Sequence, residues 1–197
     1  NSFDSRKLSV KAIAYVIAAI KAKHIFWVSE SSYNGYYFQK WLSRKSSILY
    51  NILDINSLYQ KMKMDQNEYS YDIVYVGRLT YPKNPQRLMN VLKVAIEKSS
   101  TLNVAIVGTG DLEQETRTLC MEYGLENNVT FLGFQSNPLK ILHDSKVMVM
   151  TSRWEGTPMC ALEAMALGVP IVSTPVDGLL DLITNDENGY LFDDDEQ

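Results

Sequence analysis

Cysteine and histidine are scarce in this chain of 197 residues, with two cysteines, Cys120 and Cys160, and two histidines, His24 and His143. Their spacing matches neither a disulfide framework nor a metal-binding pattern. We therefore expect reduced thiols, no metal and a cytoplasmic protein. Cys160 has no basic or histidine neighbour in the sequence, which argues against a nucleophilic role.

Long hydrophobic runs are also lacking. The longest uncharged apolar run near the start, residues 12–20, falls well short of the roughly 20 residues that a membrane-spanning helix needs. No small-residue cleavage site of the kind found in signal peptides follows it. The chain begins with "NSFDS" and ends with "DDDEQ", and we interpret it as a piece of a longer protein.

The charge is unevenly spread along the chain. Residues 1–50 hold eight Lys and Arg against two Asp and Glu, a net charge of +6, whereas residues 51–197 hold eleven against twenty-one, a net charge of −10. The basic part fits an ordinary solvated face, a contact with an acidic partner, or a peripheral contact with an acidic membrane surface on the cytoplasmic side. The sequence contains no basic patch with interleaved aromatic residues, so we expect no nucleic-acid partner.

From residue 71 onward, short apolar strands alternate with amphipathic helices. The expected strands cover residues 71–79, 102–110, 128–134, 146–152, 170–174 and 189–192, and the expected helices cover residues 86–98, 112–124, 138–145, 158–168 and 178–184. This alternation predicts an α/β fold with a doubly wound, Rossmann-like parallel sheet. Ligands of such sheets bind at the carboxyl ends of the strands.

The part before residue 71 has weaker patterns. Residues 6–22 have helical spacing, residues 24–29 and 46–51 predict strands, and residues 36–43 predict a short helix. Residues 54–70 are polar without a clear period, and we interpret them as a connecting segment.

The first candidate site follows the strand at 71–79. Gly77, Arg78 and Lys83 lie in "GRLTYPKNP", a loop that Pro82 and Pro85 stiffen by restricting φ. Two cations on a stiff loop suit a diphosphate, because Arg offers a planar fork and Lys a point charge. Two solvated surface cations are the alternative.

The second candidate site is "WEGTPMCALE". Here Thr157 can cap a helix that starts at Pro158, and the unpaired N–H groups from Met159 onward suit a phosphate. Glu155 precedes the helix, and Glu163 leans toward its N-terminus. Carboxylates accept paired hydroxyl donors, so we predict ribose on Glu163 and a sugar on Glu155. The alternatives are an exposed loop carboxylate at Glu155 and a salt bridge from Glu163 to an Arg or Lys of a neighbouring strand, for which Arg153 is one candidate.

The "GTGDLE" run at residues 108–113 has two glycines of a dinucleotide fingerprint but lacks the third. We interpret Gly108 and Gly110 as turn glycines beside the ligand cleft, with an NAD site as the alternative.

Taken in order, these motifs resemble the retaining GT-B glycosyltransferases, often called family four or glycosyl transferases group 1. The resemblance covers about residues 70–192 and includes "VYVGRL", "VAIVGTGDLE", "NVTFLGF", the Glu–x7–Glu pattern of "EGTPMCALE" and "NDENGYLF". Upstream, "HIFWVSESS" and "SSILYNILD" resemble the end of that family's N-terminal domain and the linker strand. The linker reads Asn51-Ile52-Leu53-Asp54 where the family usually has Asn-Gly-x-Asp. Asp181 stands where the family usually has Glu.

The resemblance implies three parts: a remnant of the N-terminal domain at 1–50, a linker at 51–70, and a nucleotide-sugar-binding domain at 71–197. It implies transfer of a sugar, with retention and without a metal or other cofactor, from a nucleotide-diphosphate-sugar to a glycan or lipid-linked acceptor in polysaccharide biosynthesis. The implied donor-site residues are Gly77, Arg78, Lys83, Phe134, Gln135, Glu155, Gly156, Thr157, Pro158, Met159 and Glu163, of which Arg78, Lys83 and Glu155 are catalytic.

Three functions remain open at this stage. Besides the glycosyltransferase, a sugar-nucleotide epimerase of the same fold and a non-catalytic glycosyltransferase-like subunit fit the pattern. The acceptor-binding part of a GT-B enzyme is absent from this chain, so we expect the chain by itself to lack transfer activity.

Overall fold

A computed structural model describes residues 10–193 of the chain, and side chains from residue 16 onward. Its centre is a parallel sheet of six strands: β3 (Tyr71–Val76), β4 (Val104–Val107), β5 (Val129–Gly133), β6 (Ser145–Met150), β7 (Ile171–Ser173) and β8 (Gly189–Leu191). The expected α/β fold with a doubly wound sheet is confirmed.

The strand order, β5-β4-β3-β6-β7-β8, shows how the chain winds. It runs from β3 outward to β4 and β5, then crosses back to the other side of β3 and continues through β6 and β7 to β8. The direction of winding therefore reverses between β3 and β6. In sheets of this kind, a crevice for ligands forms at the carboxyl ends of the two strands at the reversal.

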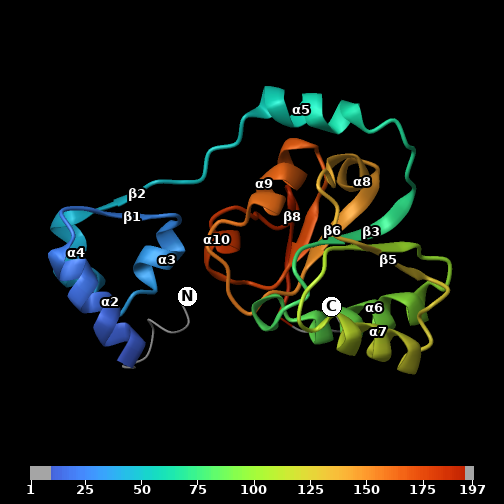
Figure 1. Ribbon diagram of the computed structural model, residues 1–197, viewed down its shortest axis with the longest axis horizontal. Coiled ribbons are helices and arrows are strands. Elements are labelled where there is room, and N and C mark those ends of the chain that lie inside the picture. The colour runs from blue at the N-terminus through green and yellow to red at the C-terminus, as the bar shows by residue number, and fades with distance from the viewer. Residues whose placement is uncertain (1–9, 194–197) are drawn as a thin grey trace.

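Helices cover both faces of this sheet (Figure 1). The helices α6 (Pro85–Lys98) and α7 (Glu113–Glu122) lie below it in this view, and α8 (Leu139–His143) and α9 (Met159–Ala166) lie above it, with the short α10 (Asp177–Leu180) near the end of the chain. The core divides in the same way. Alternate strand residues such as Val74 and Met148 belong to one buried cluster, and Ile73 and Val149 belong to the other. Period-two alternation along buried strands explains the division.

The segment at 54–70, interpreted as a connecting segment, contains a helix that the sequence analysis did not anticipate. Helix α5 spans Ile55–Met64, and the side chain of Asp54 caps it by accepting from the N–H of Ser57 at 3.0 Å. Leu58 and Met62 are buried in the same hydrophobic cluster as residues of α8 and α9. A stripe of two residues at i and i+4 is enough to bury one helix face, but it is too short to stand out as a period.

The N-terminal part consists of α2 (Val10–Lys21), β1 (Ile25–Trp27), α3 (Glu30–Asn34), α4 (Gln39–Leu42), a 3₁₀ turn (Ser43–Lys45) and β2 (Ser46–Ile48). The expected strands and the short helix are present, and α3 was not anticipated. Of the helix expected at 6–22, residues 6–9 lie outside the described part. β1 and β2 pair in parallel as a separate sheet.

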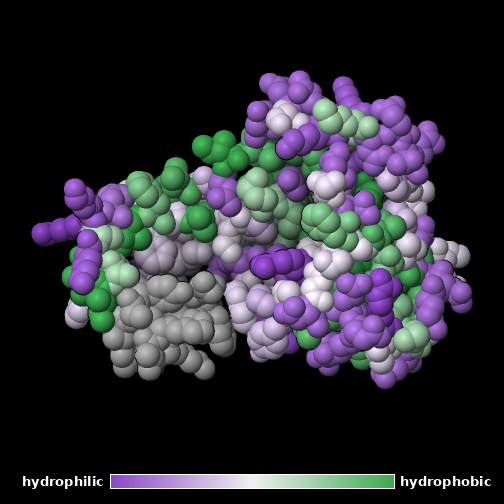
Figure 2. Space-filling view, viewed as in Figure 1, coloured by the Kyte–Doolittle hydropathy of each residue, from purple (hydrophilic) through white to green (hydrophobic). Residues whose placement is uncertain are grey.

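The surfaces of the two parts differ (Figure 2). Hydrophilic side chains cover the outer sides of α5, α6 and α7, whereas hydrophobic side chains gather on the N-terminal part. Trp41, for example, is 77% exposed there, and Phe26, Tyr37, Leu49 and Ile52 are also exposed. Within residues 10–193, no helix combines the length and the apolar character that crossing a bilayer requires.

Candidate functional site

Two loops meet at the point where the winding of the sheet reverses. We call residues 77–84, which follow β3, the β3 loop, and residues 151–158, which follow β6, the β6 loop. β3 and β6 are hydrogen-bonded neighbours, with Val74 opposite Met148. The predicted residues Gly77, Arg78, Lys83 and those from Glu155 to Pro158 therefore emerge at the same edge of the sheet.

The β3 loop is rigid at both of its ends. At the start, the buried hydroxyl of Tyr75 donates to the carbonyl of Arg78 at 3.0 Å, while the Arg78 side chain is exposed. At the end, a 3₁₀ turn over Tyr81–Lys83 leads to Asn84, which has a left-handed φ of 53° just before α6. Asn tolerates this conformation better than most residues. The loop thus presents Arg78 and Lys83 from a defined backbone.

Hydrogen bonds join the β3 loop to the β6 loop. The backbone N–H of Arg153 donates to the carbonyl of Pro82 at 2.8 Å, and its guanidinium donates to Asn84 Oδ1 at 2.8 Å. The hydroxyl of Thr151 lies 3.3 Å from the carbonyl of Lys83 and 3.2 Å from that of Asn84. The two loops therefore form one unit. Neither Thr151 nor Arg153 was expected to serve this purpose.

Lys83 and Glu155 are in direct contact. The ammonium of Lys83 pairs with Glu155 Oε1, and the hydroxyl of Ser152 donates to the same oxygen at 2.6 Å. The Lys83 and Glu155 side chains are 16% and 11% exposed, so neither is a freely solvated surface charge. In the described part of the chain, the second carboxylate oxygen of Glu155 has no partner.

The helix after the β6 loop starts one residue later than expected. α9 begins at Met159 with Pro158 as its N-cap residue, and the predicted cap by Thr157 is wrong. The hydroxyl of Thr157 donates instead to the carbonyl of Val28, which lies just after β1. Contact with the N-terminal part thus takes the hydroxyl away from the helix. The first N–H groups of α9 have no partner within the helix, which leaves positive potential beside Glu155.

Glu163 lies in the second turn of α9 and is half-buried. Burial raises the pKa of its carboxyl group, and the positive charge of Lys61 on α5 partly opposes this shift. Among residues 16–193, no side chain or backbone group is hydrogen-bonded or ion-paired with the carboxylate of Glu163. Arg153, its suggested salt-bridge partner, is bonded to Asn84 and lies over the Tyr81 ring at 4.6 Å. The alternative of a salt bridge to Arg153 is therefore wrong.

The remaining predicted residues lie at the ends of β4 and β5. Gly108, with φ of 134°, touches the β3 loop so closely that a Cβ there would stand 1.9 Å from the carbonyl oxygen of Gly77. The N–H of Gly108 donates to the carbonyl of Gly133 at 2.7 Å. Phe134, the next residue, is 74% exposed, and the side chain of Gln135 donates to the carbonyl of Leu132. The glycines therefore bring the ends of β3, β4 and β5 into contact.

The thiols and histidines have ordinary surroundings. Burial raises the pKa of Cys160 to about 11, so its thiol stays protonated at neutral pH. His24 is hydrogen-bonded to Ser47, and His143 to Asp144. Within residues 10–193, no three or more His, Cys, Asp or Glu side chains lie together in a group that could hold a metal ion.

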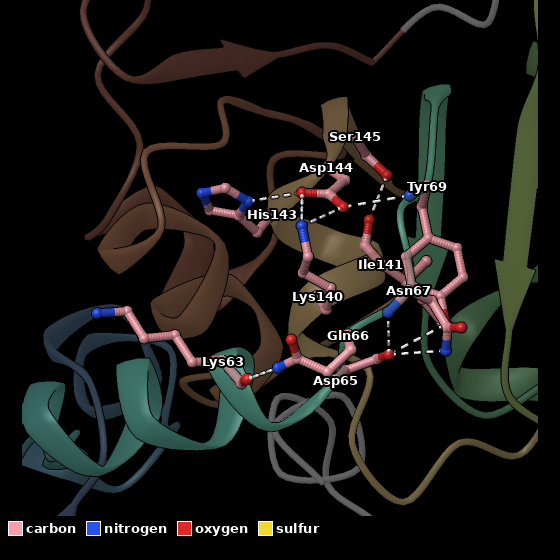
Figure 3. Close-up of polar contacts among 10 residues, drawn as sticks. All are labelled: Lys63, Asp65, Gln66, Asn67, Tyr69, Lys140, Ile141, His143, Asp144 and Ser145. Carbon is pink, nitrogen blue, oxygen red and sulfur yellow. Dashed lines mark hydrogen bonds and ion pairs between the residues drawn. The ribbon is translucent and has the colours of Figure 1, made fainter.

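A second polar cluster lies at the opposite, amino-terminal edge of the sheet (Figure 3). Asp144, just before β6, accepts from Lys140 at 2.6 Å, from His143 at 2.8 Å and from the N–H of Tyr69 at 3.2 Å. The hydroxyl of Tyr69 donates to Asp65, which follows α5. This cluster ties the segment after α5 to the end of α8. It lies away from the two loops of the site.

The fold and the two loops define a class: an α/β protein with paired cationic and acidic groups at the switch point of a parallel sheet. The comparisons with known proteins agree. This chain belongs to the family of glycosyl transferases group 1, whose profile matches residues 60–197.

Relatives illustrate the likeness. The chain is 34% identical over 142 residues to an uncharacterised glycosyltransferase of Methanocaldococcus jannaschii, which covers 68% of this chain and 35% of that protein. It is 32% identical over 154 residues to the O-antigen biosynthesis glycosyltransferase WbnH of Escherichia coli, which covers 72% and 43%. The structure of HepE from Anabaena in complex with UDP and glucose superposes with a TM-score of 0.79 at 23% identity, over 94% of this chain and 54% of that one.

These likenesses have two limits. At 23% identity, the HepE structure supports the fold alone. The chain also spans less than half the length of the two sequence relatives named here. Their fold and family extend to this chain.

Proposed function

We propose that this chain binds the nucleotide-diphosphate-sugar donor of a retaining glycosyltransferase that builds a cell-surface glycan or glycolipid. The observation that carries the proposal is the meeting of Lys83 and Glu155 at the switch point, on two loops that hydrogen bonds hold together. A donor of this kind needs cations for its diphosphate and carboxylates for its hydroxyls, and this edge of the sheet supplies both.

The diphosphate would lie against Arg78, Lys83 and the start of α9. Arg78 is exposed and has no side-chain partner within the described residues, so its guanidinium is available for a bidentate contact. These positive charges lie against the negatively charged β-phosphate and would stabilise the nucleoside diphosphate as it leaves. This stabilisation is an electrostatic form of catalysis. Two cations and a helix end would supply the charge that a metal provides in other enzymes, in keeping with the expectation of no metal.

The hydroxyls of the donor would meet the two glutamates. Glu155 has one oxygen without a partner, and the carboxylate of Glu163 is half-buried and unpaired in the described structure. Burying an unpaired carboxylate is costly, and a ribose diol would offset this cost with two hydrogen bonds. We place the transferred sugar on Glu155, the segment Gly156–Met159 around it, and the base near Phe134 and Gln135.

The names of related proteins support the donor and the pathway. The structure of HepE was determined with UDP and glucose, and the relative from E. coli is named for O-antigen biosynthesis. By analogy, the acceptor is a glycan or a lipid-linked glycan. A cytoplasmic position with peripheral contact at the inner face of the membrane fits this role, and the basic first 50 residues would favour contact with acidic lipids.

A titration tests the proposal. UDP, GDP, ADP and their glucose conjugates are added separately to the chain, and binding is followed by calorimetry. We expect one base to bind best, and we expect Arg78→Ala and Glu163→Gln each to weaken that binding about tenfold, because each removes a charge-assisted contact. Arg44→Ala and Glu122→Gln are matched controls, since both residues are exposed and lie outside the two loops.

The outcomes separate the three functions. Transfer of the sugar to an acceptor by the full-length protein, with retention, supports the proposal. Release of a free sugar with inversion at C2 of the sugar would identify an epimerase instead. Failure of every nucleotide to bind the full-length protein would contradict the donor site and favour a non-catalytic subunit.

A further inference from the structure

Glu155 places a negative charge where a diphosphate needs positive charge. Its carboxylate is paired with Lys83, the cation that faces the donor diphosphate in the proposed function. A carboxylate in contact with an ammonium cancels much of the field that a phosphate would otherwise experience. Both side chains are mostly buried, so water and salt weaken this effect little.

Glu155 cannot easily turn away from Lys83. The hydroxyl of Ser152 holds the same carboxylate oxygen at 2.6 Å, and both Ser152 and Thr151 are buried at the start of the β6 loop. The bonds from Arg153 to Pro82 and Asn84 fix the loop that carries Lys83. The opposition between Glu155 and a bound diphosphate is thus built into the two joined loops.

The two nucleotides that pass through such a site differ in charge. A free nucleoside diphosphate has a terminal phosphate whose second proton leaves with a pKa of about 6, so it carries an additional negative charge at pH 7. A nucleotide sugar has the sugar at that position and lacks this charge. Its sugar hydroxyls can also donate to the open oxygen of Glu155. The carboxylate therefore repels the free diphosphate more strongly and attracts the sugar conjugate.

On the basis of the proposed function, we propose that Glu155 makes the site select the sugar nucleotide over the free nucleoside diphosphate, and thereby promotes release of the diphosphate after transfer. While the donor is bound, a sugar hydroxyl occupies Glu155 and compensates for the opposing charge. Once the sugar has left, this compensation is lost, while Glu155 stays paired with Lys83 and continues to oppose the diphosphate. Glu155 would thus act on specificity and product release in addition to contacting the sugar.

The test is the ratio of two dissociation constants in Glu155→Gln. Calorimetry on the full chain, without acceptor, compares the nucleoside diphosphate that binds best among UDP, GDP and ADP with its glucose conjugate. We expect the variant to bind the free diphosphate about three- to tenfold more tightly, because an opposing charge is gone. We expect it to bind the conjugate about three- to tenfold more weakly, because a charged acceptor for the sugar hydroxyls is lost.

Controls show whether a change in the ratio of the two dissociation constants is specific to Glu155. Glu122→Gln removes one negative charge from the exposed face of α7 and should leave both constants unchanged. A partly unfolded preparation lowers the active fraction equally for both ligands, so the ratio of constants is unaffected by it. Glu155→Ala provides a second variant for the same comparison if Glu155→Gln fails to fold.

Two results would refute different claims. If the unaltered protein binds both ligands and Glu155→Gln or Glu155→Ala leaves the ratio within twofold of its original value, the selective role of Glu155 is wrong and the donor site stands. If the unaltered protein binds neither ligand, the proposed function fails, and this inference fails with it.

Discussion

At the scale of single residues, Glu163 is a group whose burial opposes stability. Its carboxyl has no partner in the described structure, and burial raises its pKa above the ordinary value of 4.5. The folded state therefore holds a proton more tightly than the unfolded state does. By linkage, the free energy of unfolding falls as the pH rises from about 4.5 through the raised pKa of the folded state.

We therefore predict that Glu163→Gln raises stability at pH 7 by up to about 1 kcal/mol while weakening nucleotide binding. The gain should disappear below pH 4, where the carboxyl is neutral in both states. Thermal unfolding at pH 4 and pH 7 measures the first effect, and calorimetry measures the second. A variant that is less stable at pH 7 would show that Glu163 has a stabilising partner.

At the scale of elements, α5 is part of the folded body and no loose connection. Leu58 is buried against the core, and the hydroxyl of Tyr59 donates to the carbonyl of Ala166 at the end of α9 at 3.0 Å. The side chain of Asn137, before α8, donates to the carbonyl of Lys61 at 2.7 Å. α5 therefore packs beside the helix that carries Glu163.

This packing predicts a large effect of Leu58→Ala. Removing a buried leucine side chain should lower the free energy of unfolding by about 2–4 kcal/mol, because the transfer and cavity terms add. Met64→Ala on the same helix is the control, since Met64 is 76% exposed and should change stability by less than about 0.5 kcal/mol. Urea unfolding of both variants gives the comparison. Equal midpoints would mean that α5 is detached from the core in solution.

Asp144, at the end of α8, is hydrogen-bonded to the segment that connects α5 to the sheet (Figure 3). Burial raises the pKa of this carboxyl, but hydrogen bonds from Lys140, His143 and Tyr69 outweigh it, and the pKa lies below the ordinary value of 3.8. The charged form is therefore favoured in the folded state. The stability that results is present above pH 3.8 and is lost as the pH falls through the lowered pKa.

We expect Asp144→Asn to lower the free energy of unfolding at pH 7 by about 1 kcal/mol, because charge-assisted hydrogen bonds are lost. The difference from the unaltered protein should shrink below pH 3.8. Urea titrations at pH 7 and pH 3 measure it, with the exposed Asp111→Asn as the control. A difference that stays constant with pH would show that the charge of Asp144 is unimportant.

At the scale of the whole molecule, the N-terminal part is bonded to the β6 loop and to α10. The side chain of Asn51 donates to the carbonyl of Thr157 at 2.7 Å, and the hydroxyl of Thr157 donates to Val28. The N–H of Ser31 donates to Asp181 at 3.2 Å. The loop that carries Glu155 is therefore held from the sheet on one side and from the N-terminal part on the other.

Removing one of these hydrogen bonds should change the affinity for the nucleotide sugar more than it changes the stability of the fold. We predict that Asn51→Ala weakens binding of the nucleotide sugar about two- to fivefold and lowers the free energy of unfolding by no more than about 1 kcal/mol. The side chain of the nearby Asn56 is exposed and has no partner within the described residues, so Asn56→Ala is the control. Unchanged calorimetric binding by Asn51→Ala would show that this contact does not position the loop.

The sequence by itself determined the α/β fold with its parallel sheet, and it predicted the edge of the sheet at which the candidate site lies. Apolar strands such as "VAIV" alternate with amphipathic helices, and such alternation has few folded solutions other than a parallel sheet covered on both faces. The loops after residues 71–76 and 145–150 could be assigned to the same edge of the sheet, because the carboxyl ends of parallel strands share one edge. Local rules sufficed for these predictions, since they depend on period and chain order.

Tertiary contacts decided the rest, because they join residues that no local pattern relates. Thr157 satisfies the rule for a helix cap, yet the carbonyl of Val28, 129 positions earlier in the chain, takes its hydroxyl. Arg153 was a plausible partner for Glu163 from the sequence, but Asn84 lies closer in the fold. The pairing of Lys83 with Glu155 likewise exists only because the switch point brings two loops together that are 72 residues apart.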